Sequence, residues 1–163
     1  MAPILVLILG LAIAVVIDVR SRRIPNWLTG AIAGAGFGLA AGGAAVTPGQ
    51  AALGLFAGLG LMMPGHLIGA TGAGDVKLMA AIGTVVGPSF VFRVFLYSAV
   101  AGGVLALVVA ARRGIVAATV RSAGHLIVAP REARARVESP ARVNRFAYGP
   151  AIAAGTFAAL FLR

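Results

Sequence analysis

Residues 2–17 read APILVLILGLAIAVVI and contain no charged side chain, and residues 18–23, DVRSRR, follow at once. A long apolar run that ends in clustered arginines is typical of a helix that crosses a lipid bilayer. The rest of the 163-residue chain is similar, with 60% hydrophobic and only 11% charged residues. That is too little charge to cover a soluble domain. Because backbone groups in lipid must hydrogen-bond within the protein, we expect an all-α transmembrane bundle.

Six apolar stretches divide residues 1–163, which we expect to form a single integral-membrane domain. The predicted spans are residues 2–17, 27–46, 51–70, 76–86, 90–111 and 146–162. The fourth is short for a bilayer, so its helix could continue through Pro88 as a kinked helix. A basic segment, 112–145, precedes the last span. Within it the apolar stretch 115–129 favours a helix on the membrane surface, although a seventh span is possible.

The distribution of charge orients these predicted spans. The chain has 14 Lys and Arg against 4 Asp and Glu, and the cations gather between apolar runs. Cytoplasmic loops are enriched in such cations, so we expect Arg20, Arg22 and Arg23 on the cytoplasmic side and the N-terminus outside. Alternation then puts segments 72–77 and 112–145 on the cytoplasmic side too. Cations tied to span ends also argue against a nucleic-acid binder.

Glycines recur at four-residue spacing within two of the predicted spans. They are Gly30, Gly34, Gly38 and Gly42 in the second span, and Gly54 with Gly58 and Gly65 with Gly69 in the third. Residues spaced by four share one helix face, and small residues there let helix backbones approach closely in lipid. We therefore expect these stripes to be packing faces of a tight bundle.

Acidic residues are scarce: Asp18, Asp75, Glu132 and Glu138 are the only four. Both glutamates fall in the basic segment, where solvation or pairing with arginine is expected. The aspartates border apolar spans, where a charge costs at least about 2.5 kcal/mol. Residues 1–17 as a helix cover roughly 25 Å of a core about 30 Å thick. Asp18 should therefore lie near the cytoplasmic boundary, on the same side as Asp75.

Two carboxyl groups at one level are what aspartyl hydrolysis requires, one to accept a proton from water and one to donate a proton to the carbonyl oxygen. Taken singly, each aspartate has a plainer explanation. Asp18 could simply end a span, and Asp75 could be the N-cap of the fourth helix. Their occurrence together, without other acids nearby, favours a catalytic pair.

Three motifs resemble those of the type IV prepilin peptidase family. They are GAGDVKLM at residues 72–79, DVRSRRIPN at 18–26 and AYGPAI at 147–152. The GxGD element alone also occurs in presenilin-type intramembrane proteases. The three motifs together, in this order and at these predicted membrane positions, indicate the prepilin peptidases over nearly the whole chain.

This resemblance implies an aspartyl peptidase of about six spans in the bacterial inner membrane. Such enzymes remove the short basic leader of prepilins and pseudopilins after a glycine, at the cytoplasmic membrane boundary, and Asp18 and Asp75 match their catalytic positions. Bifunctional members also carry an N-methyltransferase domain, often with a four-cysteine zinc site. This chain has no cysteine and resembles the short form that serves tight-adherence (Flp-type) pili. We therefore expect no methylation, no cofactor and no metal.

The expected mechanism has Asp18 and Asp75 sharing one water and one proton, without a covalent intermediate. Asp75 is expected at a helix N-terminus, which favours its ionised form, and Asp18 near a helix C-terminus. This contrast predicts Asp75 as the base and Asp18 as the acid, although the arginines that follow Asp18 act in the opposite sense. Gly72 and Gly74 are expected to free the backbone around Asp75.

Several polar residues beside the aspartates are candidates for loop support or substrate contact: Lys77, Arg20, Arg22, Arg23 and Asn26. Lys77 is expected to reach the lipid headgroups or the substrate. The arginines are expected to pair with an acidic residue that follows the cleavage point. Two alternatives remain open, a presenilin-like protease that cuts within transmembrane helices, and a membrane channel or scaffold that is not an enzyme.

Overall fold

The computed structural model describes residues 1–44, 46–112 and 148–162. Every regular element within these ranges is a helix, which confirms the predicted all-α class for this part of the chain. The helices are α1 (Ala2–Ser21), α2 (Asn26–Ala41), α3 (Pro48–Leu67), α4 (Ala73–Val86), α5 (Pro88–Arg112) and α8 (Gly149–Phe161). Both interpretations of residues 115–129 lie outside the described residues and stay predictions.

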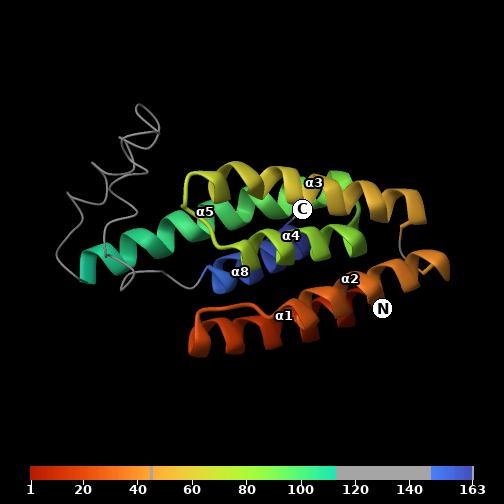
Figure 1. The fold of residues 1–163 in the computed structure, drawn as a ribbon, viewed down its shortest axis with the longest axis horizontal. Coiled ribbons are helices and arrows are strands. Elements are labelled where there is room, and N and C mark those ends of the chain that lie inside the picture. Colours follow the sequence, from red (N-terminus) through yellow and green to blue (C-terminus); the bar gives the residue numbers. More distant parts are fainter. Residues whose placement is uncertain (45, 113–147, 163) are drawn as a thin grey trace.

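Helix α4 forms the centre of the bundle. It contacts each of the other five described helices, and the ribbon runs between α3 and α5 on one side and α1 and α2 on the other (Figure 1). Ten of its 14 residues are buried. The surrounding helices leave large apolar side chains exposed, such as Leu9 at 61% and Phe56 at 67%. An outer surface of this kind fits lipid better than water.

Two of the described helices are long and apolar enough to cross a membrane. They are α1 and the Pro88–Val109 part of α5, while α8 is apolar but only 13 residues long. These two helices support a membrane protein. The arrangement with six spans and an external N-terminus stays a prediction.

Six helix ends meet at one end of the bundle, where α1, α3 and α5 finish and α2, α4 and α8 begin (Figure 1). The described cations at this end are Arg20, Arg22, Arg23, Lys77 and Arg112. We call it the basic end. The remaining described cation, Arg93, lies near the opposite end, with its guanidinium 4.6 Å from the centre of the Phe90 ring. The cations of the described residues are therefore divided unevenly between the two ends.

The junction between α4 and α5 differs from the prediction of one kinked helix. α4 stops at Val86, and Gly87 adopts φ 79° and ψ 174°, which favours glycine because it lacks Cβ. Pro88 is then the first residue of α5, the helix position that proline tolerates best. The prediction was wrong because Gly87 breaks the helix before Pro88 is reached.

The glycine stripes are only partly packing faces. Gly54 and Gly58 do pack on α4: a Cβ at Gly58 would lie 2.6 Å from the Met79 carbonyl oxygen. The predicted stripe on α2 is wrong, because a Cβ at Gly30, Gly34 or Gly38 would meet nothing within 4 Å. α2 instead buries the face that contains Leu28, Ile32, Gly36 and Ala40. This second face has the same four-residue spacing and carries Leu28 and Ile32, whereas the predicted stripe has only glycines.

Candidate active site

Asp18 lies in the last turn of α1 and points into the bundle. Its side chain continues the buried face formed by Leu7, Leu11 and Ala14, and the residue is only 4% exposed. The backbone N–H of Gly149, the first residue of α8, donates to Asp18 Oδ2 at 2.8 Å. The carboxylate therefore faces the N-terminus of α8, where partial positive charge stabilises an anion.

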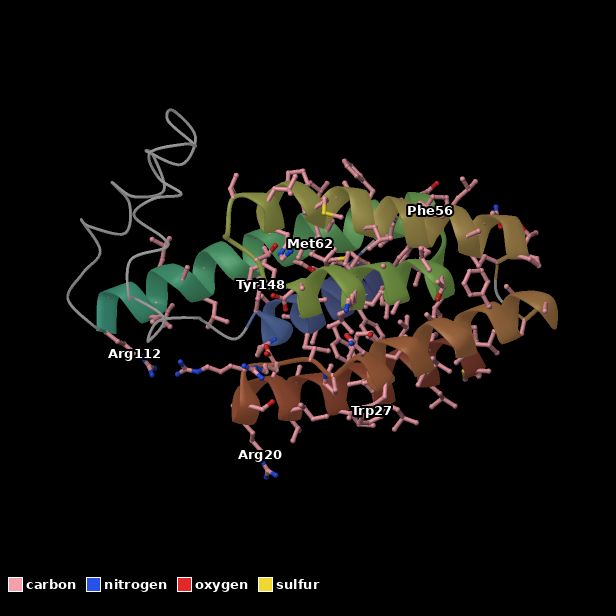
Figure 2. All side chains as sticks on the ribbon, in the orientation of Figure 1. Arg20, Trp27, Phe56, Met62, Arg112 and Tyr148 are labelled. Carbon is pink, nitrogen blue, oxygen red and sulfur yellow. The ribbon has the colours of Figure 1, made fainter. Side chains whose placement is uncertain are left out.

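The chain turns sharply after Asp18. Arg22 adopts a left-handed conformation with φ 52°, and its N–H donates to the Asp18 carbonyl oxygen at 2.8 Å. Ile24 is buried, and α2 begins at Asn26. Arg20, Arg22 and Arg23 have exposed side chains, and Figure 2 shows Arg20 pointing away from the bundle at this end.

Asp75 lies in the first turn of α4 and is 8% exposed. Gly72 is the N-cap, and its N–H donates to Asp75 Oδ2 at 3.0 Å. The alternative that Asp75 is itself the N-cap is wrong, because α4 begins at Ala73, earlier than the apolar pattern suggested. Asp75 occupies the third helical position, where its carboxylate satisfies a backbone N–H that has no partner within the helix.

The two glycines of the GAGD motif have different surroundings. A Cβ at Gly72 would lie 3.1 Å from Asp75 Oδ2, and one at Gly74 would lie 3.0 Å from Ile24 Cβ. Neither glycine has a positive φ, and Gly74 is inside α4 rather than in a loop. In this structure Gly74 lets the start of α4 pack directly on the turn that follows Asp18.

A second contact joins the same two segments. Lys77 Nζ donates to Asn26 Oδ1 at 2.8 Å, across 51 residues of sequence. Among the predicted support residues, Lys77 and Asn26 are therefore partners of each other. Their bond fastens the start of α2 to the first turns of α4, close to Asp75.

We expect the Asn26–Lys77 bond to contribute modestly to stability and to activity. Asn26→Ala and Lys77→Met each remove it, and a double-mutant cycle measured by unfolding in detergent should give a coupling of about 0.5–1.5 kcal/mol. Additive effects of the two substitutions would show that the contact contributes nothing. Gln50→Ala, at the opposite end of α3 from the aspartates, controls for the loss of a helix-end hydrogen bond, because the Gln50 side-chain oxygen accepts the Thr47 N–H there.

Tyr148 brings the surroundings of the two aspartates together. It immediately precedes Gly149, the residue that holds Asp18, and its hydroxyl donates to the Ser98 carbonyl oxygen at 3.2 Å. Asp75 is close enough to act electrostatically on the Tyr148 phenol. Figure 2 shows Tyr148 beside the starts of α4 and α8.

The structure thus places Asp18, from α1, and Asp75, from α4, at the basic end, with Asp18 against the start of α8. Each carboxylate accepts a backbone N–H at a helix N-terminus. The predicted contrast in helix dipoles between the two aspartates is therefore lost, because Asp18 also faces an N-terminus. The assignment of base and acid consequently stays a prediction without its original support.

Sequence reasoning did not assign a role to Tyr148 or Gly149. The AYGPAI motif marked this segment as a likeness to the prepilin peptidases, but no local feature shows that its backbone meets Asp18, 131 residues away. The described residues contain no group of three His, Cys, Asp or Glu side chains arranged to hold a metal ion.

The chain matches the model of a known protein family. Residues 5–107 match the type IV leader peptidase family, a range that contains most of α1, all of α2 to α4, most of α5 and both aspartates. No curated protein and no solved structure matches the chain. The matched range covers well over half of the sequence, and the chain therefore belongs to the type IV leader peptidase family.

Proposed function

We propose that this protein is an aspartyl endopeptidase that removes the basic leader peptide of prepilins, with Asp18 and Asp75 as its catalytic residues. The observation that carries the proposal is a pair of buried aspartates at one end of the bundle, Asp18 in the last turn of α1 and Asp75 in the first turn of α4. Membership of the type IV leader peptidase family supports this class of substrate.

In the proposed reaction the two carboxyl groups share a water molecule. The ionised one takes a proton from the water, whose oxygen attacks the carbonyl carbon of the scissile peptide bond. The protonated one donates to the carbonyl oxygen, and breakdown of the tetrahedral intermediate releases the leader with a new carboxylate and the mature pilin with a new amine. Two carboxylates that share one water disfavour double ionisation, so the pair carries one proton at the start of the proposed reaction.

The proposed location is the bacterial inner membrane, with about six spans, an external N-terminus and cleavage at the cytoplasmic boundary. The cations of the basic end support this orientation, and exposed apolar side chains around the bundle support direct contact with lipid. The apolar helix of the pilin would pack beside the bundle, which brings its leader to the aspartates. We propose an Flp-type prepilin as the substrate, without methylation of the product.

The test is co-expression of this chain with a prepilin, followed by mass spectrometry of the pilin. We expect removal of the leader with a new N-terminus just after a glycine, at the border between the basic leader and the apolar helix. A cut inside the apolar helix would instead support a presenilin-like protease. An intact prepilin with a correctly folded chain would favour a channel or scaffold.

The exposed arginines that follow Asp18 lead to a prediction about substrate binding. Prepilin leaders are basic, so attraction to the leader cannot drive recognition, but an acidic residue just after the cut can pair with Arg20 or Arg23. Combining Arg20→Glu with Arg23→Glu should raise KM about two- to fivefold, as expected for exposed ion pairs. Changing that acidic pilin residue to lysine should restore KM.

Arg112→Glu is the matched control, because Arg112 is also exposed at the basic end but lies on α5. An equal rise in KM with Arg112→Glu would mean that the general charge of this end matters and that no specific pair forms.

A further inference from the structure

The start of α8 lies beyond the residues that match the family, yet it contacts Asp18 directly. The contact depends on the missing side chain at position 149. A Cβ on Gly149 would lie 2.7 Å from Asp18 Oδ2 and 3.1 Å from Asp18 Cβ. Glycine is therefore the residue that lets the α8 backbone reach the buried carboxylate.

The preceding residue, Tyr148, fixes the start of α8 on α5. Its ring lies over Gly102, so closely that a Cβ on Gly102 would overlap it. Its hydroxyl donates to the carbonyl oxygen of Ser98, one turn earlier on α5. Farther along α8, Gly155 packs against Ser98, and a Cβ there would also overlap. α8 is thus held on α5 at two levels.

These contacts form a continuous series from α5 to the candidate active site. Gly102 provides the space for the Tyr148 ring, the ring sets where Gly149 lies, and the Gly149 N–H holds one oxygen of Asp18. The carboxylate itself has a terminal torsion that allows many orientations. The N–H donor selects one of them, so a shift of α8 would turn the carboxylate.

We propose that Gly102 and Tyr148 are positioning residues for Asp18, acting through the Gly149 N–H. Asp18 Oδ2 accepts the Gly149 N–H of α8, and Asp18 Oδ1 is the oxygen that acts on the attacking water. The inference rests on the proposed peptidase function where it concerns cleavage. A misplacement of about 1 Å at a catalytic group can lower the rate about 100-fold. Gly102 and Tyr148 therefore affect catalysis through the position of Asp18, without a proposed contact to the substrate.

Two adjacent glycines on α5 provide a matched test. Gly102→Ala puts a methyl group into the Tyr148 ring, whereas a Cβ at Gly103 meets nothing within 4 Å. Both changes exchange the same residue types inside one helix, so their effects on helix propensity are alike. With the full chain and a prepilin, Gly102→Ala should lower kcat about 10- to 100-fold with an unchanged KM. Gly103→Ala should change neither quantity.

A spectroscopic measurement tests the same contact without activity. In protein labelled with ¹⁵N-glycine, the Gly149 amide signal is assigned by its loss in Gly149→Ala. Hydrogen bonding to a carboxylate moves an amide proton downfield, so Gly102→Ala should move this signal upfield and Gly103→Ala should leave it in place. If Gly102→Ala does not fold, Tyr148→Phe keeps the ring and removes the bond to Ser98. A smaller fall in kcat and a smaller upfield shift are then expected.

Two results would overturn the inference. One is a wild-type kcat in a folded Gly102→Ala variant, and the other is a lower kcat in that variant with an unmoved Gly149 amide signal. The second would mean that the loss of activity arises elsewhere. If the wild type cleaves no prepilin, the proposed function fails. The position of the Gly149 amide signal in Gly102→Ala then decides by itself whether the contact of Tyr148 with α5 positions Asp18.

Discussion

Asp18→Asn and Asp75→Asn are each expected to lower kcat by about 10²- to 10⁴-fold, so that co-expressed prepilin keeps its leader. Asparagine preserves the size of the side chain and can still accept the N–H of Gly149 or Gly72 through its amide oxygen. It cannot take up or release a proton at the water. The measurement is single-turnover cleavage of a prepilin in detergent, with pilin mass as the readout.

The double variant makes this prediction sharper. When two groups act on one water, removing either one disables the pair, and the second removal costs little more. We therefore expect the double variant to be about as inactive as each single one, whereas independent contributions would multiply. Unfolding in detergent provides the control for folding. Normal processing of prepilin by either folded single variant would rule out the proposed catalytic pair.

Gly54→Ala is expected to produce the largest loss of stability among single-methyl changes in α3. A Cβ on Gly54 would overlap the carbonyl group of Gly83 on α4, whose backbone atoms cannot rotate away. α3 and α4 would have to separate, which should lower the free energy of unfolding by about 1–3 kcal/mol. Cleavage should weaken as well, because α4 carries Asp75.

Gly30→Ala is the matched control for this change. Gly30 is also a helix-interior glycine, but a Cβ there meets nothing within 4 Å. This variant should be as stable as the wild type or gain up to about 1 kcal/mol from the better helix propensity of alanine. Urea or thermal unfolding in one detergent compares the two directly. Equal stability of both variants would show that the α3–α4 contact is looser than the structure indicates.

Much of the helical architecture could be predicted from the sequence, because long uncharged runs in lipid have little choice but to form helices. The same scarcity of charge made Asp18 and Asp75 conspicuous. Details that depend on one residue's backbone were harder to predict. The break at Gly87 and the early start of α4 at Ala73 follow from local geometry that an apolar pattern does not reveal.

Contacts between residues far apart in the sequence could not be predicted for a different reason. Two faces of α2 have apolar residues or glycines at four-residue spacing, and only the packing partner decides which is buried. Likewise, nothing around Gly149 indicates that its N–H meets Asp18. Such contacts are set by the tertiary arrangement of α1, α5 and α8, which no single segment encodes.

The bond between Asp18 and Gly149 has a consequence for biosynthesis. Asp18 leaves the ribosome early, whereas its backbone partner follows 131 residues later. Until then the nascent chain has a carboxylate without the donor that α8 supplies. The site that we propose for cleavage is therefore complete only after the final described helix has joined the others.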